Sequence, residues 1–194
     1  MKASVYIATS LDGFIARPDG ALDWLPGSGN EPDADGSDVP EGDSAAAVED
    51  HGWGAFWSSV DGLVMGRNTF EKVLELAPGM WPYGGTRVIV LSRTLTAVPE
   101  ELEGKAELYA GDPQALVEKL AREGHEHLYI DGGAVIQDFL RRGLITDMSI
   151  TTIPVLIGEG IPLFGPLEED IPLKHVETKA YASGFVQSTY EISS

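Results

Sequence analysis

The sequence predicts an α/β fold, in which one largely parallel sheet is flanked by helices and carries antiparallel strands at its C-terminal end. Strand-like and helix-like stretches alternate through most of the 194 residues, which is typical of right-handed crossovers between parallel strands. The long strand candidates Asp147–Val155 and Gly184–Ile192 have no strong helix between them, which favours antiparallel pairing. A chain of this length without cysteine fits one domain that needs no disulfide framework. We therefore expect a single domain over residues 1–194.

In the first half of the chain, three strands and one helix start can be predicted from local patterns. Ala3–Thr9 alternates in the manner of a strand, Leu63–Met65 is a short apolar strand, and Arg87–Ser92 is rich in β-branched residues. Asn68 has the side chain of a helix N-cap, and Glu71 three residues later completes a capping box. This pair predicts a helix that starts at Asn68.

The second half continues the alternation with clear helix boundaries. Asp112 followed by Pro113 is the signature of an N-cap and a first helical residue. His127–Asp131 is a short strand candidate, and Gly133–Arg142 carries apolar residues at helical spacing. Gly143 supplies the residue that commonly ends such a helix.

The charge of the protein is concentrated in an acidic loop. The net charge is −18, from 31 acidic and 13 basic residues, and neither Lys nor Arg occurs between Pro18 and Gly66. Residues 27–43 (GSGNEPDADGSDVPEGD) have the composition of a flexible, solvated loop insertion. This balance argues against nucleic acid and anionic membranes as partners, because both require clustered basic residues. The apolar stretches are too short for a signal peptide or a membrane span, so the expected localisation is cytoplasmic.

Three junctions that follow predicted strands carry residues suited to phosphate binding, and ligands of open parallel sheets bind at such junctions. Met65–Thr69 (MGRNT) combines a helix N-terminus with an arginine, although it is equally an ordinary capped helix. Ile130–Ile136 (IDGGAVI) has paired glycines that allow close approach to a pyrophosphate, although a tight turn also uses them. Leu91–Thr94 (LSRT) sets a hydroxyl beside an arginine, which suits the 2′-phosphate that distinguishes NADP from NAD.

Together with the Ser10–Gly13 turn (SLDG), these motifs resemble those of the dihydrofolate reductase superfamily. The residues, the order of the motifs along the chain and the intervals between them are all similar. Ile153–Phe164 (IPVLIGEGIPLF) is similar to a stretch of the reductase domain of the bifunctional riboflavin-biosynthesis deaminase–reductase and its stand-alone relatives. The likeness covers roughly Lys2–Ile192 and is weakest over the 27–43 loop. It implies a three-layer α/β/α architecture and an NADPH-dependent reductase that acts on a small pterin-like or ribosylamino-pyrimidine-like heterocycle.

The resemblance also implies where NADPH binds. The matching positions are Ala8 against the nicotinamide carboxamide, Gly66, Arg67 and Thr69 on the phosphates, Gly132, Gly133, Ala134 and Val135 on the pyrophosphate, and Ser92 and Arg93 on the adenosine 2′-phosphate.

Three carboxylates are candidates for a catalytic role as a proton source. In dihydrofolate reductases this role involves a buried carboxylate early on the first long helix. That helix is predicted here over residues 44–59, and Asp50, or its neighbour Glu49, falls near the matching position. Asp12 follows the strand that ends at the nicotinamide pocket, and Glu159 lies between two glycines that let the backbone present a carboxylate. Each of the three is also explained as a solvated helix or turn residue.

Two other functions remain open at this level. The same pocket would serve a non-catalytic NADP(H)-binding or sensing module, and a genuine dihydrofolate reductase would bind antifolates through Asp50. The four histidines show no metal-ligand spacing, and the His/Cys/Cys module of a deaminase is absent, so no metal site is expected. The riboflavin-type relatives are commonly dimers, which implies a homodimer in which Gly184–Ile192 pairs across the interface.

Overall fold

The structure is a computed structural model that describes residues 1–26 and 50–193. The acidic loop 27–43, Glu49 and the beginning of the helix predicted over 44–59 lie outside these residues.

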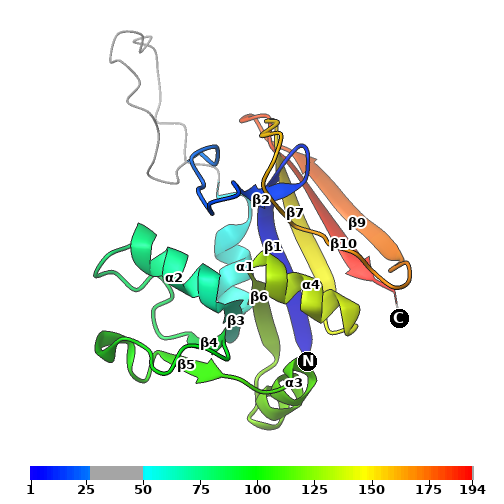
Figure 1. Cartoon of the computed structure of the whole chain (residues 1–194). Coiled ribbons are helices and arrows are strands. Elements are labelled where there is room, and N and C mark those ends of the chain that lie inside the picture. Colours follow the sequence, from blue (N-terminus) through cyan, green and yellow to red (C-terminus); the bar gives the residue numbers. More distant parts are fainter. Residues whose placement is uncertain (27–49, 194) are drawn as a thin grey trace.

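A central sheet of eight strands organises the described part of the chain (Figure 1). Its strands are β1 (Lys2–Ser10), β3 (Gly62–Gly66), β4 (Arg87–Leu91), β5 (Ala106–Tyr109), β6 (His127–Asp131), β7 (Asp147–Ile153), β9 (Leu173–Ala180) and β10 (Val186–Ile192). Their order is β5-β4-β3-β6-β1-β7-β10-β9. The strands from β5 to β7 run parallel, and β10 pairs antiparallel with both β7 and β9. The predicted fold class is therefore confirmed. The expectation that Gly184–Ile192 pairs across an interface is wrong, because both edges of β10 are already paired within the chain.

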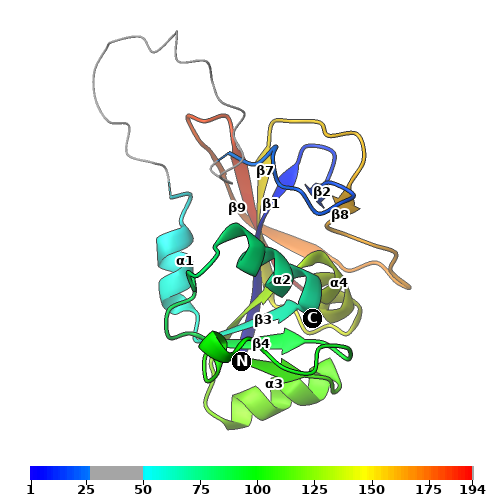
Figure 2. The same ribbon diagram turned by 60° about the vertical axis from the view of Figure 1, so that its left-hand side comes forward.

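The helices cover both faces of this sheet. They are α1 (Trp53–Ser59), α2 (Arg67–Leu76), α3 (Pro113–Arg122) and α4 (Gly133–Arg141), with a short 3-10 helix at Glu100–Leu102. Phe56 of α1 and Phe70 of α2 pack on the face that carries Leu63. Leu116 of α3 and Phe139 of α4 pack on the opposite face. Figure 2 shows α1 and α4 on opposite sides of β1, so the protein has the expected three layers.

Two helix boundaries follow the predicted local rules. The Asp112 carboxylate accepts hydrogen bonds from the amides of Gln114 and Ala115, and thereby caps α3. At the end of α4, Gly143 has a φ of 63°, and the Leu144 amide donates to the Phe139 carbonyl at 2.9 Å. This bonding pattern is that of a Schellman motif, for which glycine is the favoured residue.

The start of α2 differs from the prediction. The helix begins at Arg67, its N-cap is Gly66, and no side chain caps it. Asn68 and Glu71 therefore lie within the helix, and the predicted capping box is wrong. The physical reason is that β3 runs directly into α2, since Gly66 is both the last strand residue and the cap.

Some strands were not predicted from the sequence. β9 and β5 belong to the main sheet, and β2 (Phe14–Ala16) pairs with β8 (Ile161–Pro162) in a separate two-stranded sheet. β9 is exposed along all of its residues, so burial imposes no alternating pattern on its sequence.

Candidate functional site

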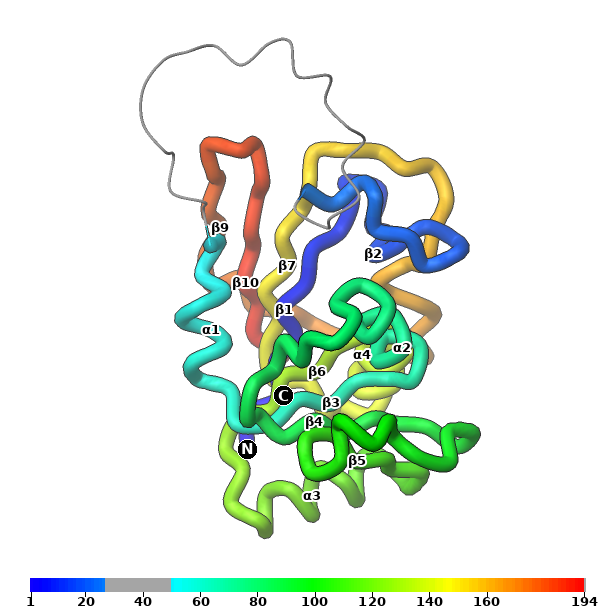
Figure 3. The backbone as a smooth tube through the Cα atoms, turned by 90° about the vertical axis from the view of Figure 1, so that its left-hand side faces the viewer, coloured from blue at the N-terminus to red at the C-terminus, as the bar shows by residue number. Residues whose placement is uncertain are grey.

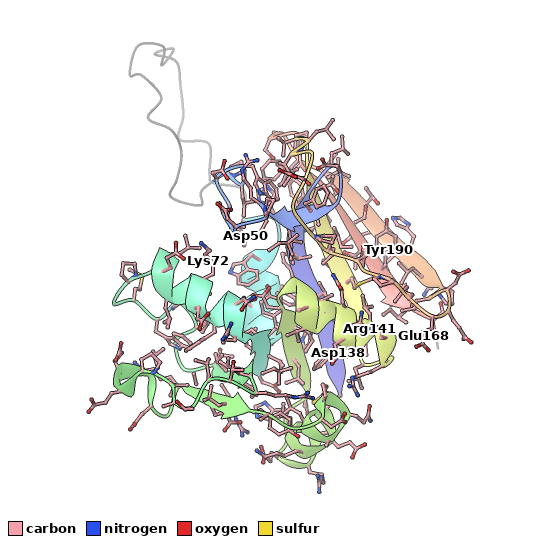
Figure 4. All side chains as sticks on the ribbon, in the orientation of Figure 1. Asp50, Lys72, Asp138, Arg141, Glu168 and Tyr190 are labelled. Atoms are coloured by element: carbon pink, nitrogen blue, oxygen red, sulfur yellow. The ribbon has the colours of Figure 1, made fainter. Side chains whose placement is uncertain are left out.

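A cavity of about 860 Å³ opens at the carboxyl ends of β1, β3, β4, β5 and β6. All ten residues that were candidates for cofactor binding line it. Figure 4 labels Lys72 of α2 and Asp138 of α4, which line the cavity from opposite layers of the fold. The structure therefore brings the three predicted phosphate-binding junctions into one site.

The cavity lies where the direction of the chain crossovers reverses. β3 and β6 are adjacent, with Met65 paired to Asp131 at their carboxyl ends. The helix that follows β3 packs on one face of the sheet, and the helix that follows β6 packs on the other. The loops after these two strands consequently separate and leave a crevice, which is the position where open α/β sheets bind ligands.

Two helix N-termini meet in this crevice without side-chain caps. Gly66 caps α2 and Gly132 caps α4, and neither helix has a side-chain hydrogen bond to its first amides. A Cβ added to Gly132 would overlap with the Thr69 hydroxyl and lie 3.9 Å from the Gly66 nitrogen. Glycine is therefore needed for the two helix starts to approach, and their free N–H groups form a ready site for an anion.

Basic side chains add positive charge to a strongly acidic protein. Arg67, Lys72, Arg93 and Arg142 line the cavity. Arg67 donates a hydrogen bond to the Thr94 hydroxyl at 3.1 Å. Acidic side chains line the same cavity, namely Asp19, Glu71, Glu75, Asp131 and Asp138. Glu71, Glu75 and Asp138 pair with Arg67, Lys72 and Arg142 respectively, so the site carries both signs of charge.

Ser92 shapes the turn that carries Arg93. The Ser92 hydroxyl accepts hydrogen bonds from the amides of Thr94 at 3.2 Å and Leu95 at 2.9 Å. These bonds fix the backbone that presents Arg93 to the cavity.

Sequence reasoning missed several residues at both ends of the cavity. At one end Ile15 of β2 and Ile161 of β8 join Ala8 in an apolar wall, and at the other Tyr109 and Arg142 line the site. Tyr109 is the last residue of β5, a strand that was not predicted. Ile161 belongs to the Ile153–Phe164 stretch and reaches the site through the pairing of β8 with β2.

Asp131 is the carboxyl group most deeply set in this site. It ends β6, lines the cavity, and accepts a hydrogen bond from the Gly132 amide at 2.8 Å. Burial raises the pKa of Asp131, and the bond from Gly132 opposes this shift. Burial also raises the pKa of Tyr83 and Tyr129, and the charge of Asp131 raises both further. Asp131 belongs to the Ile130–Ile136 stretch, whose sequence gives no sign that this carboxyl group is buried.

The three predicted catalytic carboxylates do not line this cavity. Asp50 is exposed and precedes α1 (Figure 4), so Asp50 is not the buried helix carboxylate that was expected, and the alternative, Glu49, lies outside the described residues. Its carboxylate accepts hydrogen bonds from the amides of Gly52 at 2.6 Å and Gly54 at 3.0 Å, which lower its pKa. Asp12 bonds to backbone amides of the loop before β8, and Glu159 is exposed in that loop.

Within residues 1–26 and 50–193, no group of three or more acidic, histidine or cysteine side chains has an arrangement that could hold a metal ion. The helices of the same residues include none with the length and apolar character to cross a membrane.

Comparison with known proteins agrees with this architecture. The sequence profile of the RibD C-terminal domain matches residues 2–187. Uncharacterized protein YwjB of Bacillus subtilis (strain 168) is 33% identical over 182 residues, which cover 93% of this chain and 92% of that protein. The crystal structure of a provisionally named riboflavin biosynthesis protein from Shewanella sp. PV-4 is similar with a TM-score of 0.83 and 40% identity, over the whole of both chains.

A longer protein shares the fold alone. The diaminohydroxyphosphoribosylaminopyrimidine deaminase/5-amino-6-(5-phosphoribosylamino)uracil reductase of Thermotoga maritima has a TM-score of 0.68 and 14% identity. The present chain spans 56% of that protein. Taken with the profile match over nearly its full length, the chain belongs to the RibD C-terminal domain family.

Proposed function

We propose that this protein is an NADPH-dependent reductase that transfers hydride to a small pyrimidine-like or pterin-like heterocycle. The observation that carries the proposal is the meeting of two glycine-started helix N-termini without side-chain caps in one cavity at the point of the sheet where the crossovers reverse. Membership in the RibD C-terminal domain family supports it. The uracil reductase activity named for the Thermotoga maritima protein suggests the substrate class.

The residues present fit a dinucleotide phosphate. Gly132 and Gly133 let Thr69 and Ile15 pack against the start of α4. The N–H groups of the two helix starts supply hydrogen-bond donors for a diphosphate. Arg93, on the turn shaped by Ser92, lines the cavity and would bind the 2′-phosphate. The cavity volume is within the usual range for cofactor sites.

Bound NADPH would supply the hydride, and the protein would orient the two reactants and exclude water from the site. Ala8, Ile15 and Ile161 line one end of the cavity as an apolar wall that would hold the nicotinamide ring and exclude water from it. Reduction of a C=N or C=O bond also requires a proton on the heteroatom. We assign that proton to Asp131, because burial raises its pKa and it faces the cavity, whereas Asp50 is exposed and its pKa is lowered.

The first test is a titration with NADPH and with NADH, read from the fluorescence of the four tryptophans. We expect micromolar NADPH binding and weaker NADH binding. Arg93→Ala should weaken NADPH binding by about tenfold or more, since a charged hydrogen bond contributes about 1.5–3 kcal/mol. NADH binding should not change, so the preference for NADPH should be lost. Arg141→Ala is the matched control, because Arg141 is an exposed arginine of α4 that does not line the cavity. Failure of the wild-type protein to bind either nucleotide would refute the proposal.

A second measurement separates catalysis from binding alone. NADPH oxidation is followed by absorbance with a panel of pyrimidine and pterin acceptors, dihydrofolate included. Turnover of a pyrimidine or pterin supports the reductase. Binding of NADPH without turnover of any acceptor would support a non-catalytic NADP(H)-binding module instead. Tight antifolate binding that Asp50→Ala abolishes would identify a dihydrofolate reductase.

A further inference from the structure

Asp12 joins two loops beside the apolar end of the cavity. It lies in the turn between β1 and β2, and its carboxylate accepts hydrogen bonds from the amides of Ile157 at 3.2 Å and Gly158 at 2.8 Å. These two residues belong to the segment that connects β7 to β8. The Ser10 hydroxyl and the amides of Gly158 and Ile157 lower the pKa of Asp12, so the carboxylate remains ionised and accepts strong hydrogen bonds.

Further contacts hold the same two loops together. The Leu11 amide donates to the Val155 carbonyl at 2.8 Å, and the Leu163 amide donates to the Gly13 carbonyl at 3.1 Å. A Cβ added to Gly160 would overlap with a carbonyl of β2. Figure 3 shows the chain around β2 beside the chain that leads to β8. The two loops therefore form one packed unit, in which Asp12 provides the side-chain hydrogen bonds to the amides of Ile157 and Gly158.

This unit carries two residues of the cavity wall and rests on α4. Ile15 and Ile161 line the cavity. A Cβ added to Gly133 would lie 2.8 Å from the Ile15 Cδ1 atom, so this glycine allows Ile15 to lie against the start of α4. Gln137 of α4 donates a hydrogen bond to the Pro162 carbonyl at 3.1 Å. The position of the loop unit thus determines the position of the apolar wall.

We propose that Asp12 is a positioning residue: it fixes the loop unit so that Ile15 and Ile161 hold the nicotinamide end of the site in register with the substrate. This inference rests on the proposed NADPH-dependent function. Asp12 does not touch the ligand, since it does not line the cavity. Loss of its carboxylate leaves the amides of Ile157 and Gly158 without their partner and loosens the wall. Misplacement of a reacting group by about 1 Å can lower a rate by about a hundredfold.

The test compares Asp12→Ala and Asp12→Asn with Glu168→Gln. Glu168 is an exposed carboxylate of the segment after β8 (Figure 4), and its replacement also removes one negative charge. Asparagine keeps one oxygen that accepts a hydrogen bond, so it should restore part of what alanine loses. Each variant is measured for affinity for 2′,5′-ADP, for the fluorescence of bound NADPH, for kcat and KM, and for amide hydrogen exchange over residues 155–163.

We expect Asp12→Ala to bind 2′,5′-ADP as the wild type does, because that fragment occupies only the adenosine end. The fluorescence of bound NADPH should change, kcat should fall by about tenfold or more, and residues 155–163 should exchange faster even without ligand. Asp12→Asn should be intermediate and Glu168→Gln unchanged.

Three results for Asp12→Ala would overturn its positioning role. They are unchanged exchange over residues 155–163, unchanged kcat, or a loss of 2′,5′-ADP affinity as large as the loss of kcat, which would indicate a defect of the whole fold. A wild-type protein that binds neither NADPH nor 2′,5′-ADP would instead overturn the proposed function itself. The exchange measurement distinguishes the two failures, because it needs no ligand.

Discussion

Replacement of Gly132 by alanine should be unusually damaging for so small a change. Gly132 has a φ of 88° and a ψ of 129°, a conformation that costs residues with a Cβ about 1–3 kcal/mol. The new Cβ would also overlap with the Thr69 hydroxyl, and overpacking of this kind costs about 1–3 kcal/mol. We therefore expect Gly132→Ala to lower the free energy of unfolding by about 2–6 kcal/mol and to weaken NADPH binding.

The two contributions can be separated by urea unfolding followed through tryptophan fluorescence. Gly143→Ala is the matched control, because Gly143 has a φ of 63° and no atom within 4 Å of the added Cβ. It should lose only the conformational part, about 1–2 kcal/mol. Adding Thr69→Ala to Gly132→Ala removes the overlapping hydroxyl. The double variant should therefore be about 1–3 kcal/mol more stable than the sum of the two single changes predicts. Strict additivity, or a loss in Gly132→Ala no larger than in Gly143→Ala, would refute the reasoning.

Three further outcomes follow from titrating and buried polar groups. If Asp131 donates the proton, wild-type turnover should fall as pH rises through its raised pKa, and Asp131→Asn should lose this pH dependence. A pH–rate profile identical to that of the wild type would contradict the assignment of Asp131 as the proton donor. Burial lowers the pKa of His127, so the unfolded state binds the proton more readily, and stability that is complete above about pH 6.5 should decline as pH falls below it. Urea unfolding over this window should show a smaller decline in His127→Gln, and an equal decline in both proteins would exclude His127 as the source. The amide nitrogen of Gln187 donates to the Tyr6 hydroxyl at 2.9 Å and to the Thr151 hydroxyl at 3.0 Å; Gln187→Ala should therefore lower the free energy of unfolding by about 1–3 kcal/mol, and a change below about 0.5 kcal/mol would show that water replaces these bonds.

Local rules were sufficient where the stabilising bonds are local. Asp112 caps α3 as predicted because its carboxylate bonds amides two and three residues ahead. Gly143 ends α4 because the closing bonds span only a few residues. Gly132 in the Ile130–Ile136 stretch was also recognisable, since a strand that turns directly into a helix needs a residue that tolerates positive φ.

Longer-range contacts decided what local rules could not. The predicted cap at Asn68 was wrong because β3 pairs with its neighbours as far as Gly66 and leaves no room for a separate cap. β9 was missed because its pairing with β10, rather than burial of one face, holds it in the sheet. In each case the bonding partner lies on another element of the chain.

The sequence by itself determined the α/β class, the positions of most strands along the chain, and the glycine and arginine residues at the three junctions, because each depends on a short stretch of chain. Only the tertiary structure decided that these junctions meet in one cavity, since that depends on which strands are adjacent and on which face each helix packs. It likewise separated the exposed Asp50 from Asp131 within the site. The pKa of a carboxyl group depends on how far surrounding elements exclude water from it, and residues far apart in sequence supply those elements.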